Sequence, residues 1–232
     1  MESPTDGTST LIVEDLLLLL LDDEKGYIAG EGTLYYPLGG AVLIELALDG
    51  HVRFEPAQRK FAAAKVHAVE GRPPSDPMLA EAYEVVAKKP RTAQELLILI
   101  GTKLRVPVAD RLVERGLVRR NTKKVLGLFR STSWPAADVR HEAELREQIE
   151  AVLVEGRDPD PRTGAVIALL AASGQMQQVL EYPELSWTAL GKRADAIIEG
   201  NWAAEAVKDA IVATNAAIVA VTTGTVVSIV TQ

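Results

Sequence analysis

The sequence predicts a mainly α-helical protein, built as a single helical-bundle domain with surrounding amphipathic helices and one small β-hairpin. Three observations carry this prediction. Apolar segments rich in Ala, Leu and Val are repeatedly closed by Gly or Pro, as bundle helices are. No Pro/Gly/Ser-rich linker divides the 232 residues. Hydrophobic residues make up 47% of the chain and aromatic residues only 5%, so aliphatic side chains must fill the core.

Each element is placed by its boundary residues. Ser9 or Thr10 can cap the first helix, because a side-chain oxygen there accepts from free backbone N–H groups, and Gly26 closes it. Thr92 and Glu95 form a capping box. The expected helices lie at residues 11–27, 41–48, 77–89, 95–101, 107–116, 138–156, 163–174, 184–200 and 201–221, with a loop at 30–40 and an alternating strand at 51–55.

The chain ends and the apolar runs bear on membrane association. Residues 1–8 are expected to form a disordered tail ahead of a domain over residues 9–232, and they lack the positive segment of a secretory signal. The run at residues 11–21 is shorter than the about 20 residues that a spanning helix needs. Residues 210–232 carry no charge, but their Thr, Ser, Asn and Gln content favours a buried helix with a short extended end.

Positive charge is concentrated in one segment. Residues 103–130 hold nine bases and two acids, so the segment is +7 in a chain of net charge −7, which leaves −14 elsewhere. Such asymmetry can hold an anionic partner on an otherwise repelling protein. Residues 117–130 read as two partly apolar strands around a basic turn at residues 121–124. The residues expected to bind lipid or another anion are Lys103, Arg105, Arg111, Arg119, Arg120, Lys123 and Lys124.

Three interpretations of this basic hairpin stay open on the sequence alone. Its charges can simply keep an exposed strand edge from pairing with other chains. They can meet a membrane surface or a lipid phosphate. The order helix, turn, helix and basic hairpin is also typical of a winged-helix nucleic-acid binder, although the acidic remainder of the chain would repel a duplex.

Enzyme signatures are absent from the sequence. The chain has no Cys, and its three histidines lack ligand spacing, so neither thiol chemistry nor a metal centre is predicted. It contains no nucleophile elbow, Walker lysine loop or dinucleotide fingerprint. Glu14, Asp15 and Glu45 are expected to pair with Arg or to cap backbone groups, and Trp134 to be partly exposed after the hairpin. No catalytic residue and no cofactor is predicted.

Several motifs occur in a recognisable order. A leucine-rich helix with two acids leads to the turn Asp-Glu-Lys-Gly-Tyr at residues 23–27. Leu-Gly-Gly-Ala-Val-Leu-Ile-Glu-Leu-Ala-Leu-Asp-Gly follows at residues 38–50, and Leu-Val-Glu-Arg-Gly at residues 112–116 precedes the hairpin. In this order, and over nearly its whole length, the chain resembles the Golgi phosphoprotein 3 family, as a bacterial member. The resemblance implies phosphatidylinositol 4-phosphate binding and an adaptor role on membranes.

The resemblance also implies where an anion would bind. The family's phosphate pocket uses a Trp, which corresponds here to Gly30 or Glu31. It also uses one Arg that corresponds to Gly39, and two more that correspond to Thr102 and Arg105. Only Arg105 keeps the family's residue type, so binding is expected to depend on total anionic charge. The family's hairpin serves membrane contact and self-association, which here implies Val118, Val125, Leu126, Leu128 and Phe129.

The predicted function is therefore a non-enzymatic, peripheral membrane or adaptor-type protein of the cytoplasm, bound to the cytoplasmic face of a membrane. Its expected partners are anionic lipid, protein tails and a second copy of the chain. The alternative is a winged-helix-like nucleic-acid-binding regulator.

Overall fold

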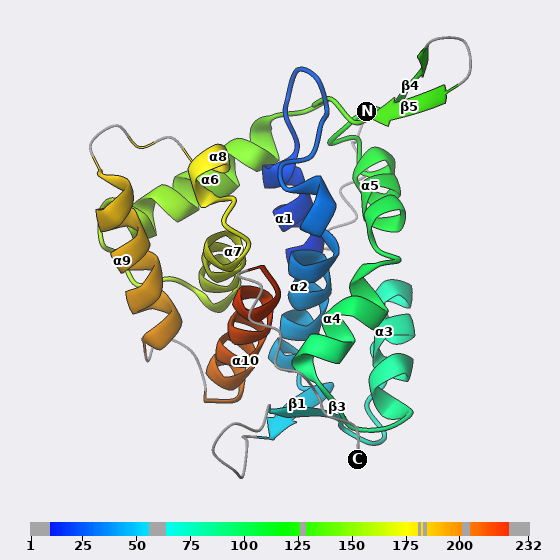
Figure 1. Cartoon of the computed structure of the whole chain (residues 1–232), viewed down its shortest axis with the longest axis vertical. Coiled ribbons are helices and arrows are strands. Elements are labelled where there is room, and N and C mark those ends of the chain that lie inside the picture. Colours follow the sequence, from blue (N-terminus) through cyan, green and yellow to red (C-terminus); the bar gives the residue numbers. More distant parts are fainter. Residues whose placement is uncertain are drawn as a thin grey trace, which may run out of the picture.

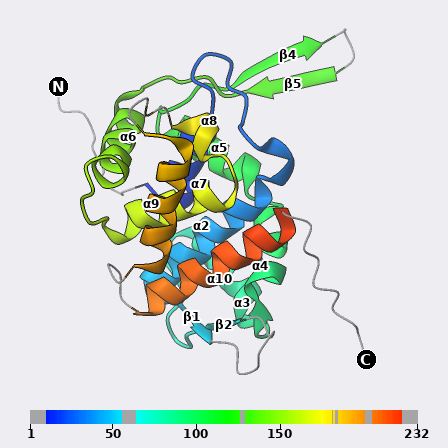
Figure 2. The same cartoon turned by 60° about the vertical axis from the view of Figure 1, so that its left-hand side comes forward.

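A computed structural model describes residues 10–55, 64–125, 129–180, 182, 185–200 and 205–222, and it confirms the mainly α-helical fold (Figure 1). In chain order the elements are α1 (Ile12–Leu20), the 3₁₀ helix η1 (Glu31–Thr33), α2 (Tyr35–Leu48), β1 (Val52–Glu55), β2 (Lys65–Ala68), α3 (Pro77–Ala87), β3 (Arg91–Thr92), α4 (Ala93–Gly101), α5 (Arg105–Glu114), β4 (Asn121–Val125), β5 (Phe129–Ser133), α6 (Arg140–Leu153), α7 (Pro161–Ala172), α8 (Met176–Val179), α9 (Trp187–Glu199) and α10 (Glu205–Thr222). The strands form an antiparallel sheet of order β1–β2–β3 and a separate antiparallel ribbon, β4–β5, at opposite ends of the molecule (Figures 1 and 2).

Helix α2 lies at the centre of the bundle and packs against α1, α4, α7 and α10 (Figures 1 and 2). Glycines permit its close contact with α4. A Cβ atom on Gly39 would lie 2.6 Å from the carbonyl oxygen of Leu97, and one on Gly101 would lie 1.7 Å from the carbonyl oxygen of Tyr35. The two helices therefore approach so closely that any side chain at these positions would separate them.

This packing corrects the expected loop at residues 30–40, because α2 begins at Tyr35. Pro37 lies in the first turn of the helix, where its missing N–H leaves no hydrogen bond unmade. Gly39 and Gly40 are helical because neighbouring helices need the space: a Cβ on Gly40 would lie 2.6 Å from the Thr214 side chain of α10. Local propensity predicted a loop here, and tertiary packing overrides it.

Helix α1 is buried along its whole length, which confirms that the leucine-rich run is a core helix. Its expected boundaries are wrong at both ends. The helix starts after Leu11, whose N–H donates to the Glu14 carboxylate at 2.8 Å, so an acid of the first turn replaces the expected Ser or Thr cap. It ends at Leu20, well before Gly26, which lies in a turn with a φ of +67°.

Other local signals are confirmed. The Thr92–Glu95 capping box closes in both directions, at 2.9 Å and 3.3 Å. The C-terminal segment forms the partly buried helix α10, while residues 223–232 lie outside the described part of the chain, as do residues 1–9. Within the described residues, no helix is both long enough and apolar enough to cross a bilayer.

The hairpin exists, but the pairing of its strands differs from the expectation. Residues 121–124 belong to strand β4 rather than to the turn, and the chain reverses between Val125 and Phe129, which pair with each other. The sequence has Gly127 in that interval, and tight turns favour glycine more than they favour a run of basic residues. Leu126 and Leu128 fall in the same interval, outside the described residues. Val118 lies before the strand and forms an isolated bridge with Ala136.

Candidate anion-binding site

The predicted basic residues do not present one uniform surface. Arg111 on α5 and Arg115, the residue directly after α5, point inward to Glu14, which is fully buried: Arg115 Nε donates at 2.7 Å, and Arg111 Nε lies 3.3 Å from the same oxygen. Arg111 also donates to Asp76 at 2.8 Å. Burial opposes its charge, yet hydrogen bonds to Glu14 and Asp76 raise the pKa of Arg111. These two guanidinium groups join α5 to α1, so the charge of +7 overstates what residues 103–130 offer a ligand.

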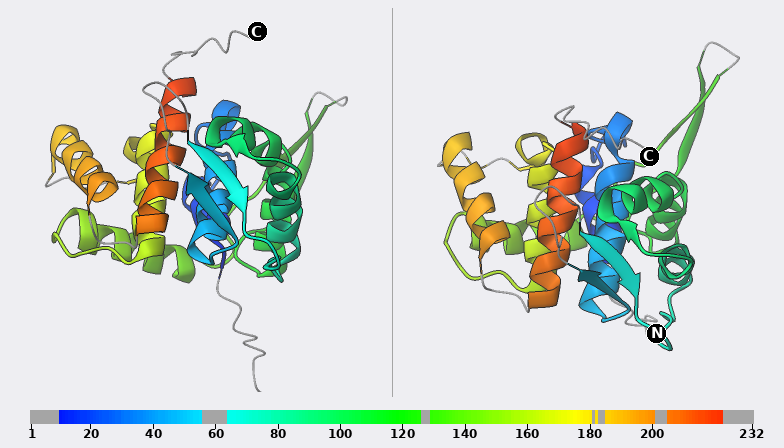
Figure 3. Two further views of the ribbon diagram at one scale, coloured as in Figure 1. Left: turned by 90° about the horizontal axis from the view of Figure 1, so that it is seen from below. Right: turned by 60° about the horizontal axis from the view of Figure 1, so that its bottom comes forward.

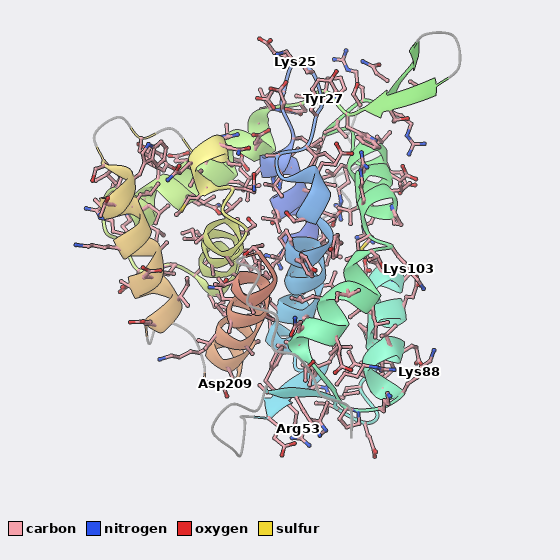
Figure 4. The ribbon with its side chains drawn as sticks, in the orientation of Figure 1. Lys25, Tyr27, Arg53, Lys88, Lys103 and Asp209 are labelled. Atoms are coloured by element: carbon pink, nitrogen blue, oxygen red, sulfur yellow. The ribbon has the colours of Figure 1, made fainter. Side chains whose placement is uncertain are left out.

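The remaining bases differ in whether a carboxylate pairs with their charge. Arg120 pairs with Asp110 in the middle of α5. Lys103 Nζ lies 3.9 Å from Glu81, and the Lys103 side chain is 71% exposed and points outward in Figure 4. Arg119 is exposed, and no carboxylate within the described residues pairs with it. Lys123 and Lys124 lie on β4, and their side chains are outside the description.

Arg105, the first residue of α5, is the centre of the candidate site. Its guanidinium carbon lies 5.5 Å from the centroid of the Trp134 ring, which is a cation–π distance. Its Nη2 atom lies 2.5 Å from a carboxylate oxygen of Glu31 in η1. The Arg105 guanidinium group therefore contacts two other segments besides its own helix α5: the loop before α2 and the segment after the hairpin.

Trp134 is 4% exposed, so the expectation of a partly exposed ring is wrong. The cause is a contact with the turn at residues 23–27. The backbone N–H of Trp134 donates to the Gly26 carbonyl at 3.1 Å, and a Cβ on Gly26 would lie 2.3 Å from that same backbone nitrogen. The glycine of the Lys-Gly-Tyr turn thus lets the chain after the hairpin approach and carry the indole to Arg105.

Two buried N–H groups at this place have no acceptor among the described residues: Nε of Arg105 and Nε1 of Trp134. A buried donor that makes no hydrogen bond costs about 1–3 kcal/mol, and charge-assisted bonds to phosphate or carboxylate are stronger than neutral ones. Adjacent unsatisfied donors beside a guanidinium favour an oxygen-rich anion.

The family's other phosphate-binding positions do not join this site. At Gly39, the backbone of α4 already occupies the space that a side chain would need. The Thr102 hydroxyl donates to the Ile98 carbonyl at 2.9 Å, within its own helix end. Sequence analysis did not identify Trp134 as a site residue. Because it reaches Arg105 only through the distant Gly26 turn, no local spacing signals the contact.

Apolar side chains are exposed beside these bases. Ile98 and Leu99 of α4 and Val106 of α5 are exposed near Lys103 and Arg105 in sequence. Exposed apolar residues flanked by bases are typical of surfaces that contact membranes or partner proteins. Between α3, α4 and α5, a cavity of about 280 Å³ opens next to them.

The described residues contain no group of three or more His, Asp or Glu side chains placed to hold a metal ion. Glu14, Asp15 and Glu45 pair with cationic side chains, as expected for buried acids: Asp15 lies 2.9 Å from His141, and Glu45 lies 2.5 Å from Arg162. The three acids therefore join α1 and α2 to α5, α6 and α7.

The winged-helix alternative is not supported. A recognition helix needs bases free to meet DNA, whereas Arg111 of α5 and Arg115 directly after it are held by a buried carboxylate. The buried face of α5, with Val108 and Leu112, packs into the core.

Comparison with known proteins identifies the family of this chain. The family described as Golgi phosphoprotein 3 (GPP34) matches residues 12–214. A vacuolar protein sorting-associated protein 74 from Eremothecium gossypii is 28% identical over 177 residues, which are 66% of this chain and 51% of that protein. Its namesake from Schizosaccharomyces pombe is 27% identical over 165 residues, 61% of this chain and 48% of that protein. The chain thus spans about half the length of these relatives. Because the family match covers most of its length, the chain belongs to the Golgi phosphoprotein 3 family.

Proposed function

We propose that this protein is a non-enzymatic, peripheral membrane or adaptor-type protein that binds anionic lipid. The lipid-binding surface would combine the β4–β5 ribbon, the exposed Arg119 and the site at Arg105 and Trp134. The protein would act in the cytoplasm, on the cytoplasmic face of a membrane. The names of its relatives refer to protein sorting, which supports protein tails as further partners.

The single observation that carries the proposal is the composition of the ribbon. It projects beyond the helices in both views of Figure 3. Its register places Lys124 directly opposite Arg130, and the next pair toward the turn joins Val125 to Phe129. Lys25 and Tyr27, on the turn after α1, lie at the same end of the molecule (Figure 4).

Residues 119–130 carry five bases and no acid, and a two-stranded hairpin is only marginally stable in water. Each base near an anionic surface contributes about 1 kcal/mol. The apolar pair at the far end is suited to the interface between headgroups and acyl chains. The ribbon therefore fits a membrane better than it fits bulk water.

Co-sedimentation with vesicles tests the proposal. Vesicles containing phosphatidylglycerol or phosphatidylinositol 4-phosphate, at matched total charge, are expected to bind the protein alike and to release it as salt rises. The double variant Lys124→Gln/Arg130→Gln should lose most of the binding. The control variant Arg157→Gln/Lys192→Gln removes the same charge near and on α9, and it should retain the binding. Equal sedimentation with neutral phosphatidylcholine vesicles would contradict the proposal.

The ribbon also suits self-association, because both of its edges carry backbone groups that no further strand of the described chain pairs. A second copy could add strands to it or cover its apolar end. This extension of the proposal concerns Val125, Leu126, Leu128 and Phe129. Val118 does not join them, because it is 2% exposed and forms a bridge with Ala136 of its own chain.

A further inference from the structure

We propose that Glu31 is a built-in competitor for the anion site at Arg105, so that an anionic headgroup binds there only after it displaces this carboxylate. The inference rests on the proposed function, because it describes the regulation of the same site. It makes the loop before α2 an autoinhibitory element.

Glu31 is held in place rather than free to swing. It begins η1 directly after Gly30, which has a φ of +66° and packs so tightly that a Cβ there would lie 2.7 Å from the Gln175 side chain. The Thr33 N–H donates to the Gly30 carbonyl at 2.9 Å and closes the turn. A carboxylate tethered in this way competes intramolecularly, so a ligand must bind the guanidinium better than Glu31 does in order to displace it.

Glu31 satisfies the site only in part. Its carboxylate takes one end of the guanidinium, at 2.5 Å from Nη2 of Arg105. Nε of Arg105 and Nε1 of Trp134 stay without an acceptor among the described residues. A phosphate offers more acceptor oxygens than a carboxylate and can reach several donors at once. The ligand that would replace Glu31 is therefore a phosphate-bearing headgroup.

The site does not depend on Glu31 to keep its shape. The Trp134 ring holds the guanidinium from another side, and Trp134 is itself fixed by the Gly26 turn. The Glu31 and Arg105 side chains are 50% and 40% exposed, so the ion pair exchanges with solvent at little cost. Displacement of Glu31 would leave Arg105 ready for the ligand.

Titration with pyrophosphate, a soluble probe, tests the inference without a membrane. Binding is followed by the indole N–H resonance of Trp134 in nitrogen-15 NMR spectra, assigned with Trp134→Phe. Glu31→Gln is expected to lower the dissociation constant by up to about fivefold, the upper end of the range for an exposed ion pair. Glu155→Gln is the matched control, because Glu155 is also exposed and pairs with an arginine, at 2.8 Å from Arg157. Its dissociation constant should equal that of the wild type.

Arg105→Gln supplies the second arm. This change should abolish pyrophosphate binding at the site in the wild type and in the Glu31→Gln background alike, because the guanidinium is the contact for which Glu31 competes. If Glu31→Gln and Glu155→Gln bind pyrophosphate equally, or if no variant binds it, the competitor role is wrong. A gain for pyrophosphate without binding to any anionic vesicle would uphold the role of Glu31 and overturn the membrane proposal.

Discussion

Arg162 stabilises the buried carboxylate of Glu45, and its replacement by Met is expected to destabilise the fold in a pH-dependent way. Glu45 is 3% exposed in α2. Its two oxygens accept from Arg162 Nη1 and from the Ile12 N–H, each at 2.5 Å. Arg162 also donates to the Thr10 carbonyl and lies 3.7 Å from Asp15. One guanidinium thus joins α7 to both α1 and α2.

The magnitude follows from burial. Removing one partner of a fully buried ion pair costs about 3–5 kcal/mol. Because the Arg162 side chain is 37% exposed, water screens the pair, and we expect about 2 kcal/mol. Burial raises the pKa of Glu45 above its ordinary 4.5, while Arg162 and the Ile12 N–H lower it. Without Arg162, the pKa must rise further.

The sign of the pH dependence follows. A carboxyl group with a raised pKa in the folded state favours folding at low pH, and this stability is lost as pH rises from 4.5 through the raised pKa. In Arg162→Met the carboxyl group can become neutral at low pH but must be charged and unpaired at high pH. The variant should therefore lose little stability near pH 5 and about 2 kcal/mol near pH 8.

Urea unfolding followed by circular dichroism measures these differences at both pH values. Glu45→Gln should restore much of the stability when it is added to Arg162→Met, because no unpaired charge is left. An equal loss at pH 5 and pH 8, or strictly additive effects of the two changes, would refute the reasoning. Arg162 would then act through packing and through Thr10 alone.

Three further outcomes are expected. In urea unfolding, Gly101→Ala should cost more than about 2 kcal/mol, because its Cβ would lie 1.7 Å from the Tyr35 carbonyl oxygen, whereas Gly191→Ala, which has open space in α9, should gain about 0.5–1 kcal/mol. Burial raises the pKa of Glu142 from 4.5 to about 7, so the wild type should lose stability as pH rises through this interval, and Glu142→Gln should flatten the loss in urea titrations. Replacing residues 121–133 by Gly-Ser should leave the helical circular dichroism nearly unchanged and reduce the mass in light scattering to that of one 25.0 kDa chain. A wild type that is already monomeric at tens of micromolar would contradict self-association.

Local signals were enough to predict most helices of this protein. The Thr92–Glu95 capping box is a short-range hydrogen-bonding pattern, and it forms as expected. The aliphatic composition predicted a helical core filled mainly by Ala, Leu and Val, and such side chains make up most of the buried residues. The buried acids also pair with cations as expected, because a charge that is taken out of water requires a counter-charge.

Boundaries that depend on distant neighbours were not predictable. Gly39 and Gly40 suggest a loop when only their own propensities are considered. They lie in a helix because α4 and α10 approach at these positions, and only glycine leaves room for that approach. The turn of the hairpin was likewise placed at its most polar residues, although strand pairing shifted it to the interval around Gly127.

The sequence alone therefore established the family, the helical class and a cluster of positive charge between residues 103 and 130. It did not reveal which of those bases a ligand can reach. A charge count depends only on composition, whereas an ion pair requires atoms within about 4 Å that are often far apart in the chain. Glu14 forms ion pairs with Arg111 and Arg115. Glu31 and Trp134 both contact Arg105. These contacts arise because the chain brings the segments before α2 and after β5 together at the start of α5.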